Sequence, residues 1–243
     1  MMVHFLERQW KKITSREEDS HQTFWTWRLT PIGYAMHKAL FLLIAKYMRG
    51  KLLDVGAGTM LYKKDLTKHC ISYVSVDKFS NHKSLDYRYD INDLKFDDAS
   101  FDSIFCNQVL EHLEDPQKAL QELDRILHAK GKLLIGVPFF YYLHGLPHDY
   151  YRFTEFGLKK MLGDSGFKII TLQSSGGFFS TFIEPFNIAF TFLGFNIPLW
   201  KQFINSLNFI LFVFPFYLLD LLLHTKSRFP SVYFLVAQKE ETI

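Results

Sequence analysis

Residues 52–60 read LLDVGAGTM, an apolar run that ends in Asp54 and is followed by two glycines, Gly56 and Gly58. A short apolar run bounded by turn residues predicts a buried parallel strand. The glycines predict a tight turn that a ligand can approach closely, because glycine carries no Cβ. Ligands of open α/β sheets bind at the carboxyl ends of the strands. The stretch therefore predicts a nucleotide-type site at the head of an α/β sheet.

Two classes of ligand use such a turn, and the residues that follow Gly58 help to separate them. The dinucleotide fingerprint G-x-G-x-x-G needs a third glycine, and Leu61 occupies that position here. The other class has an acidic residue before G-x-G and binds S-adenosylmethionine. Asp54, Gly56 and Gly58 resemble motif I of the class I methyltransferases, a family that often has a further glycine where this chain has Met60.

Further cofactor contacts are predicted along the next strands. Residues 73–77, YVSVD, read as a strand that ends in Asp77, about twenty residues after the turn, where a carboxylate accepts hydrogen bonds from ribose hydroxyls. The resemblance implies that Asp90 and Ile91, at the end of a third strand over residues 85–91, meet the adenine ring. Asn107, which follows a strand predicted over residues 101–106, completes the predicted cofactor-binding set.

The resemblance continues along the chain from residue 51 to residue 138. Its later parts are the Glu111-His112 pair, an Asp-Pro start at Asp115 of a helix that Gly131 ends, and a strand over residues 132–137. This order is similar to that of the small-molecule, "type 11" class I methyltransferases. It implies an α/β fold with a doubly wound, mostly parallel, Rossmann-like sheet of seven strands.

Four parts of the chain are predicted. A helical lead-in covers residues 1–50 and includes a helix from Pro31 to about Gly50, and the cofactor-binding core covers residues 51–177. An apolar helical insertion follows at residues 178–230. The last strand, in residues 231–243, completes the core by pairing antiparallel with the strand over residues 166–172.

Composition limits the classes of partner and compartment. The formal charge of +3, from 28 basic and 25 acidic residues, gives little reason to expect nucleic-acid binding. Cys70 and Cys106 form no disulfide framework and have no metal-type spacing, and the first residues lack the apolar core of a signal peptide. We therefore expect a protein of the cytoplasm, in peripheral contact with the inner face of the membrane if the insertion binds lipid.

The insertion is rich in phenylalanine, and residues 203–223 are long and apolar enough to span a bilayer. Polar residues such as Asn208 and Asp220 interrupt this run, and one crossing would separate the last strand from its sheet and leave an unpaired edge. The sequence favours an interfacial or re-entrant hairpin over a helical lid that packs on the domain or on a second subunit. The predicted headgroup neighbours are Trp200, Lys201, His224, Lys226 and Arg228.

Possible active-site groups, His144 and His148 among them, gather in residues 144–154, which end in the run PHDYYRFT at 147–154. This run resembles one in bacterial methyltransferases encoded among surface-glycan and cell-envelope genes. Methyl transfer from a sulfonium is an in-line displacement that depends on alignment, and a hydroxyl acceptor also needs a base, for which histidine is suited. His148 is the first candidate and His112 the second, with Tyr151 and Arg152 positioning the acceptor. The alternative role of His112 is to order its own loop.

The sequence predicts no metal ion. Some quinone-ring O-methyltransferases hold a divalent metal with a comparable acidic and histidine cluster, but Gln108 stands here where a second carboxylate would be expected.

The leading functional hypothesis is an S-adenosylmethionine-dependent O-methyltransferase that acts on a lipid-linked glycan or another lipophilic small-molecule acceptor. One alternative is a methyltransferase of quinones or other prenylated rings. The other is a catalytically inactive module of the same fold that mediates interactions at the membrane, against which the intact set of Asp54, Gly56, Gly58, Asp77 and Asp90 argues.

Overall fold

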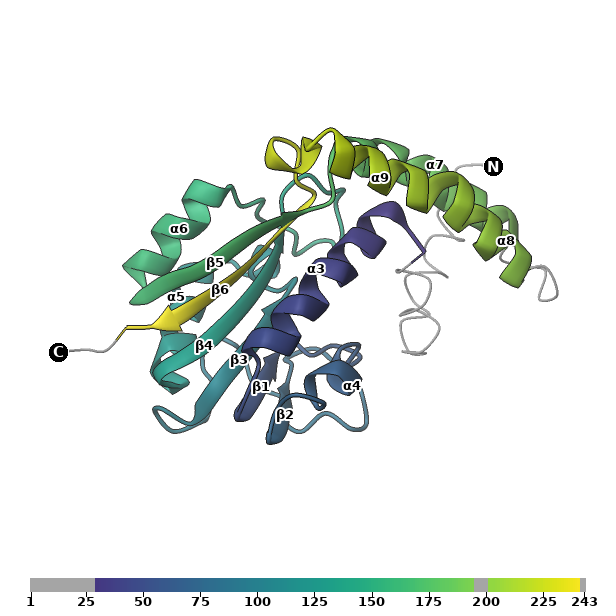
Figure 1. The fold of residues 1–243 in the computed structure, drawn as a ribbon. Coiled ribbons are helices and arrows are strands. Elements are labelled where there is room, and N and C mark those ends of the chain that lie inside the picture. Colours follow the sequence, from purple (N-terminus) through teal and green to yellow (C-terminus); the bar gives the residue numbers. More distant parts are fainter. Residues whose placement is uncertain (1–28, 195–200, 241–243) are drawn as a thin grey trace.

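The computed structural model describes residues 29–194 and 201–240. A six-stranded sheet forms its centre, in the order β2-β1-β3-β4-β6-β5 (Figure 1). The first four strands in this order are parallel, and β6 is antiparallel to both of its neighbours. The strands are β1 (Lys51–Val55), β2 (Ser72–Val76), β3 (Phe101–Asn107), β4 (Leu127–Pro138), β5 (Phe167–Ser175) and β6 (Val232–Lys239).

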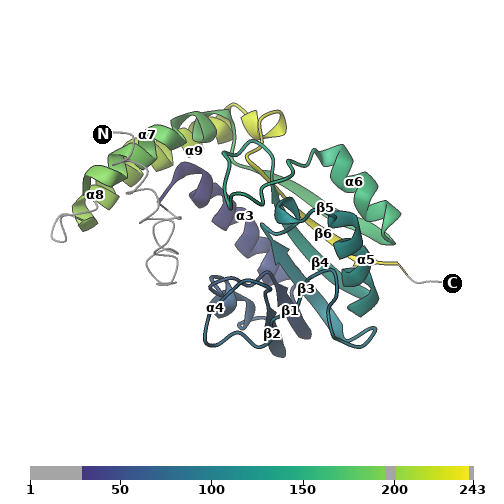
Figure 2. The same ribbon diagram turned by 180° about the vertical axis from the view of Figure 1, so that it is seen from behind.

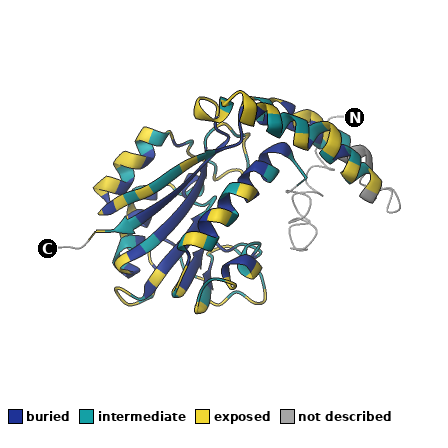
Figure 3. Cartoon of the chain, viewed as in Figure 1, coloured by how far each residue is buried: buried dark blue, intermediate teal, exposed yellow. Residues whose placement is uncertain are grey.

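Helices cover both faces of the sheet, as the doubly wound prediction requires. Helix α3 (Pro31–Tyr47) and the short α4 (Lys63–Leu66) lie on one face, and α5 (Pro116–Ile126) and α6 (Glu155–Asp164) lie on the other (Figures 1 and 2). The four central strands, β1, β3, β4 and β6, are buried along most of their length, whereas the edge strands β2 and β5 are partly exposed (Figure 3). One apolar cluster packs beneath α5 and α6 and a second beneath α3, so the sheet separates two cores.

Local chemistry explains where two of these helices begin. The Thr30 hydroxyl accepts a hydrogen bond from the Gly33 amide, and Pro31 follows at the first helical position of α3. Asp115 caps α5 in the same way, because its carboxylate accepts a bond from the Lys118 amide at 3.0 Å and Pro116 follows. Both helices were predicted from these residues, and both predicted starts are confirmed.

The sheet differs from the prediction in its strand count, because residues 85–91 do not form a strand. They run beside β2 and make only an isolated bridge between Val76 and Tyr87. The side chain of Asp86, rather than a backbone carbonyl, accepts the bond from the Ser75 amide at 2.9 Å. A regular ladder cannot form where a side chain takes the place of a backbone partner. The predicted seventh strand is therefore absent from the described residues.

A second difference lies between α5 and β4. The predicted helix was to end at Gly131, but α5 ends at Ile126 and β4 begins at once with Leu127. Leu127 pairs with Phe101, and an irregularity in the ladder then accommodates Lys130, whose φ is +63°. The last strand is placed as predicted, since β6 pairs antiparallel with β5, and it also pairs with β4.

The insertion forms a helical hairpin. Helix α7 (Phe178–Gly194) packs against a second helical arm made of α8 (Lys201–Asn208), the π-helical η3 (Phe209–Val213) and α9 (Phe214–Leu222). The hairpin extends beyond the sheet (Figures 1 and 2). The hairpin leaves the sheet at the carboxyl end of β5. Strand β5 runs parallel to β4, because both are antiparallel to β6, so this is the same edge at which β1 to β4 end. The short η4 (Thr225–Ser227) leads back to β6.

Candidate active site

The glycine turn after β1 folds over the end of β2. The amides of Gly56 and Ala57 both donate to the Val76 carbonyl, at 2.8 and 3.1 Å. Gly56 has a φ of +67°, and a Cβ there would lie 2.3 Å from a methyl carbon of Val109, so the position requires glycine. Among the atoms of the described residues, a Cβ on Gly58 would meet only the Gly56 carbonyl oxygen, at 4.0 Å. The space beside Gly58 is therefore open to a ligand.

Asp77 lies directly against this turn. One carboxylate oxygen accepts a hydrogen bond from the Gly58 amide at 2.9 Å, and the other accepts bonds from the amides of Phe79 and Ser80 at 2.7 and 2.8 Å. A carboxylate has about four lone-pair sites, so at least one acceptor position stays available for a ribose hydroxyl. The sequence predicts that Gly58 and Asp77 lie at the same edge of the sheet, and in the structure a hydrogen bond joins them.

Asp54 lies beneath the turn rather than in it. Its side chain is buried, and the Tyr73 hydroxyl of the neighbouring strand donates to it at 2.6 Å. Burial raises the pKa of Asp54 to about 7, although the bond from Tyr73 lowers it. Asp54 thus links β1 to β2 through Tyr73, a partner that no local pattern in the sequence indicates.

The other predicted cofactor residues take different positions. Asp90 accepts bonds from the Lys78 ammonium at 2.7 Å and the Asn92 amide at 2.9 Å, and the bond from Lys78 lowers its pKa. Ile91 is buried in the core beneath α5. Asn107 ends β3 next to Gly136, and its buried Oδ1 has no hydrogen-bond partner within residues 29–194 and 201–240. An unpartnered buried acceptor of this kind is suited to a ligand amine or hydroxyl.

These features fit an S-adenosylmethionine-type ligand. The open side of Gly58, the Asp77 carboxylate and the unpartnered Asn107 oxygen all lie at the carboxyl ends of β1, β2 and β3. Asp77 would hold the ribose, and Asn107 would meet a donor group. When bound, the cofactor supplies an electrophilic methyl group.

His148 lies over the same edge of the sheet. Its ring stacks on that of Phe79, with centroids 6.4 Å apart and planes 7° apart, only two residues from Asp77. Its Nδ1 is 3.0 Å from the Tyr150 hydroxyl, and that hydroxyl donates to a Glu114 carboxylate oxygen at 3.3 Å. Because the hydroxyl proton points to Glu114, the Tyr150 oxygen accepts from His148 Nδ1. The Nε2 atom of a neutral His148 then carries the lone pair that a base needs.

Arg152 and Tyr151 hold the loop itself. All five N–H donors of Arg152 are engaged: they bond to both carboxylate oxygens of Asp149 and to the carbonyls of Tyr141, Tyr142 and Tyr151. The bonds from Arg152 lower the pKa of Asp149 to about 2. The Tyr151 hydroxyl donates to the Glu114 carbonyl at 3.0 Å. In this geometry both residues hold the loop in shape. Either residue would therefore influence an acceptor through the conformation of the loop.

His112, the second candidate base, faces inward. Its Nδ1 is 2.7 Å from the His148 carbonyl oxygen, and its Nε2 is 3.9 Å from a carboxylate oxygen of Glu111. His144 approaches the same carboxylate from the following loop, with its Nε2 at 3.6 Å. His112 therefore belongs to a cluster with Glu111 and His144. The sequence places His144 among the possible active-site groups of its loop but does not indicate its contact with Glu111, because nothing local shows which part of the fold that loop meets.

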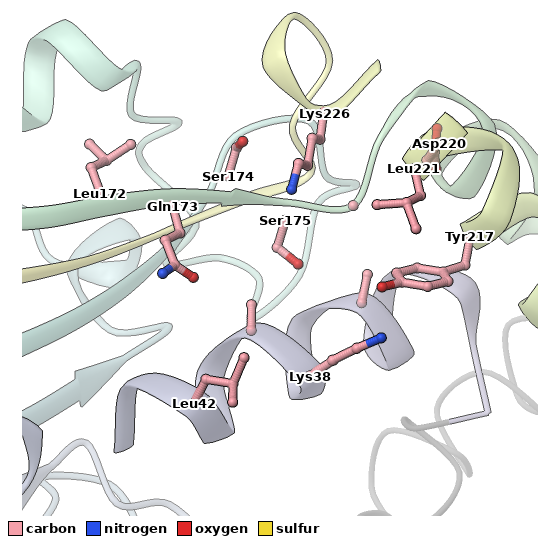
Figure 4. Close-up of a pocket in the computed structure, with 13 residues that line it drawn as sticks. Lys38, Leu42, Leu172, Gln173, Ser174, Ser175, Tyr217, Asp220, Leu221 and Lys226 are labelled. Carbon is pink, nitrogen blue, oxygen red and sulfur yellow. The ribbon is translucent and has the colours of Figure 1, made fainter. Parts of the chain in front are cut away.

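A cavity of about 410 Å³ lies elsewhere, between α3, the end of β5 and α9. Lys38 and Lys226 line it, and the Lys38 ammonium lies 5.2 Å from the centre of the Tyr217 ring (Figure 4). Leu42, Leu172 and Leu221 supply its apolar walls. It borders the hairpin and includes none of the predicted site residues.

Comparison with known proteins finds similarity to methyltransferases. Residues 53–135 match the model of a family described as "Methyltransferase domain". A ubiquinone biosynthesis O-methyltransferase of Coxiella burnetii is 31% identical over 103 residues, which are 37% of this chain and 44% of that protein. An uncharacterized protein of Methanocaldococcus jannaschii, MJ1123, is 30% identical over 92 residues, 37% of this chain and 45% of the relative. The matches thus span less than half of these relatives.

Solved structures show the same fold. A putative methyltransferase of Bacillus halodurans is 17% identical with a TM-score of 0.53, over 84% of this chain and 98% of that one. An N-methyltransferase of Haemonchus contortus, in complex with S-adenosylhomocysteine, is 16% identical with a TM-score of 0.54, over 87% of this chain and 54% of that one. Residues 53–135 thus match a methyltransferase-domain family, and the chain has the Rossmann-like α/β fold of solved methyltransferase structures.

Proposed function

We propose that this protein transfers a methyl group from S-adenosylmethionine to a hydroxyl group of a lipophilic acceptor, a lipid-linked glycan in the leading form, at the cytoplasmic face of a membrane. The observation that carries the transfer is the position of His148 beside Phe79, next to the Asp77 carboxylate and the glycine turn. This arrangement brings a candidate base and a candidate cofactor site to one edge of the sheet.

The proposed mechanism assigns a step to each residue. Asp77 holds the cofactor through its ribose, which fixes the direction from which the methyl group is offered. His148 Nε2 accepts the proton of the acceptor hydroxyl as the oxygen attacks. The imidazolium that forms is stabilised by the Tyr150 hydroxyl and, behind it, by the Glu114 carboxylate. A positioned base of this kind contributes about 10²–10⁴-fold to the rate, and alignment of the reactants contributes the rest.

The distribution of polar side chains in the hairpin supports a lipophilic acceptor. Three of its polar residues are buried and hydrogen-bonded: Asn187 donates to Asn208 at 2.7 Å, and Asp220 accepts bonds from the amides of Phe179 and Ser180 at 2.9 and 2.8 Å. The large exposed side chains of the hairpin are apolar. They include Phe182, Phe186, Phe203, Ile210, Leu211, Phe214 and Leu222.

This pattern is the reverse of that expected for a hairpin in water, and it suits the boundary of a lipid bilayer. Among the described residues, the stretch Phe203–Leu222 is long and apolar enough to cross a membrane, and 17% of its most apolar window is buried. The hairpin leaves the sheet at the edge where the candidate site lies, so an acceptor with a lipid tail would have its polar end near His148. His224, Lys226 and Arg228 follow the apolar arm and suit acidic headgroups.

A quinone or another prenylated ring is the second candidate acceptor. The relative in Coxiella burnetii that carries the name ubiquinone biosynthesis O-methyltransferase favours it. Both acceptors join a hydroxyl group to a long apolar tail, so both agree with the hairpin. Incorporation of labelled methyl groups into extracted lipids, separated into glycolipid and quinone fractions, distinguishes them.

Flotation with liposomes tests the membrane part of the proposal. We expect the wild-type protein to float with vesicles of phosphatidylglycerol and phosphatidylethanolamine, and the double variant Phe182→Glu, Phe186→Glu to stay in the unbound fraction. Phe156→Glu is the matched control, because Phe156 is 79% exposed but lies on α6, away from the hairpin. Wild-type protein that stays unbound would remove the membrane from the proposal and leave the hairpin as a lid or a subunit interface.

A further inference from the structure

The side chain of Glu111 has a surrounding that a carboxylate rarely tolerates. It is 0% exposed, and neither of its oxygens has a hydrogen-bond partner within residues 29–194 and 201–240. Buried charges in proteins are paired or bind metal ions, because an isolated charge is costly outside water. An ionised Glu111 therefore needs a cation beside it.

Two imidazoles face this carboxylate. The Nε2 atoms of His144 and His112 lie 3.6 and 3.9 Å from the same oxygen of Glu111. One ligand atom from each of the three residues can be chosen so that all lie within 4.8 Å of one another. His144 Nε2 is itself buried without a hydrogen-bond partner in the described part of the chain.

The other ring nitrogens point at acceptors. His112 Nδ1 lies 2.7 Å from the His148 carbonyl oxygen, and His144 Nδ1 lies 3.3 Å from the Tyr142 carbonyl oxygen. His144 Nδ1 is also 3.6 Å from a carboxylate oxygen of Asp149. Each Nδ1 is thus placed to carry the proton, which leaves the Nε2 lone pairs directed at Glu111. Histidines that bind metal ions show this arrangement, in which the second nitrogen donates to a carbonyl or carboxylate.

The backbone holds the three side chains in place. Glu111 and His112 are consecutive residues of the 3-10 turn η2 (Leu110–His112), and the amides of Tyr150 and Tyr151 donate to the Glu111 carbonyl at 2.8 and 3.3 Å. Gly145, with a φ of +64°, packs on the His112 ring, where a Cβ would lie 2.7 Å from Cε1. The loop that carries His144 is therefore fixed against η2 from both sides.

We propose that Glu111, His112 and His144 form a binding site for a divalent transition metal ion, with Zn²⁺ as the best match. Two imidazoles and one carboxylate are a ligand set that zinc uses when positions are left open for water or substrate, whereas magnesium prefers oxygen ligands. The site lies beside the loop of His148, so an acceptor oxygen could occupy an open position. Metal binding by these side chains does not depend on the proposed methyl transfer.

This inference departs from the sequence-based expectation of no metal, which rested on Gln108. In the cluster the third ligand is His144, from the loop after β4, rather than a second carboxylate at position 108. That ligand is distant from Glu111 in the sequence and becomes its neighbour only through the fold.

The test is a zinc titration of the full chain, freed of purification tags and stripped with a chelator. We expect the wild type to bind one equivalent of Zn²⁺ in competition with a chromophoric chelator. Glu111→Gln and His144→Ala should each weaken binding by more than the ~10–100-fold that loss of an outer-shell partner costs. His128→Ala, which removes an exposed histidine at the start of β4, is the matched control and should bind as the wild type does.

Two further measurements keep the test decisive. On addition of Zn²⁺ to the wild type, the NMR signals of the ring nitrogens of two histidines should shift. This measurement does not depend on whether a variant folds. S-adenosylhomocysteine binding, measured on the same samples, separates this inference from the proposed function. Zinc binding without S-adenosylhomocysteine binding would support the site and contradict the function. Absence of zinc binding by folded wild type, or equal binding by His144→Ala, would overturn the site.

Discussion

His148 Nδ1 lies 3.0 Å from the Tyr150 hydroxyl, which donates in turn to Glu114 at 3.3 Å. In the proposed mechanism this chain of hydrogen bonds orients the His148 ring. It fixes the tautomer of the ring and stabilises the imidazolium, as a second group does for catalytic histidines. In the proposed mechanism Tyr150 holds the base, whereas Tyr151 holds the loop through its bond to the Glu114 carbonyl.

Tyr150→Phe tests this relay. The variant keeps the ring but removes the hydroxyl, so His148 loses the partner that fixes its tautomer. We expect the rate of labelled methyl transfer to membrane lipids to fall by about tenfold or more, and His148→Gln to cost about 10²–10⁴-fold. Affinity for S-adenosylhomocysteine should stay unchanged in both. Tyr87→Phe, which changes a tyrosine beside β2, is the control. An unchanged rate in Tyr150→Phe would remove the hydroxyl from the mechanism.

Gly56→Ala tests the packing of the turn. A Cβ at this position would lie 2.3 Å from Val109, and its φ of +67° disfavours any residue with a Cβ. Overpacking costs about 1–3 kcal/mol and a left-handed conformation about 1–2 kcal/mol, so we expect a loss of about 2–4 kcal/mol in the free energy of unfolding.

The matched control for this substitution is Gly163→Ala in α6, where a Cβ meets no atom of residues 29–194 and 201–240 within 4 Å. That change should stabilise the protein by about 0.4–1 kcal/mol, because alanine restricts the unfolded chain and favours the helix. Urea unfolding measures both free energies. Equal effects of the two substitutions would contradict the account of the turn.

Glu184 gives a prediction of pH dependence. This residue of α7 accepts a bond from the Ile32 amide of α3 at 3.3 Å, and burial raises its pKa from 4.5 to about 7. The folded state therefore binds its proton more tightly than the unfolded state. The stabilisation that this provides is complete below about pH 4.5 and is lost as the pH rises through 7.

Glu184→Gln should remove this dependence. At pH 4.5 the variant and the wild type should have similar unfolding free energies, since the wild-type side chain is neutral there. At pH 8 the variant should be more stable, by on the order of 2–3 kcal/mol. Glu155→Gln, in a solvent-exposed pair with Lys159, is the control. Urea unfolding at both values checks this, and a variant that is less stable at pH 8 would show that the charged form is the favoured one.

Much of the parallel core could be predicted because each element carries its own local signal. The run LLDV before Gly56, the cap at Asp115 and the apolar strand β4 each follow from neighbouring residues. The absent strand over residues 85–91 could not be predicted in this way. The Asp86 carboxylate accepts the hydrogen bond from the Ser75 amide of β2 that a backbone carbonyl would accept in a strand. This contact depends on where β2 lies.

In the site, too, the residues with a local signal could be predicted, and the contacts that depend on the fold could not. Gly58 and Asp77 follow strand ends, so their meeting was expected, whereas the support of Asp54 by Tyr73 depends on the pairing of β1 with β2. His144 shows the limit most clearly. Its place beside Glu111 depends on a loop conformation that Arg152 and Gly145 hold, and no periodicity in the sequence specifies it.

The most direct test of the central claim is calorimetric binding of S-adenosylhomocysteine to the wild-type protein and to Asp77→Asn. A hydrogen bond to a charged group is worth about 1.5–3 kcal/mol, so the variant should bind at least about tenfold more weakly. Asp98→Asn, which changes an exposed carboxylate that pairs with Arg125, should bind as the wild type does. Micromolar binding that Asp77→Asn weakens would establish the cofactor class and its ribose contact. No binding by folded wild-type protein would contradict the account and favour an inactive module of the same fold.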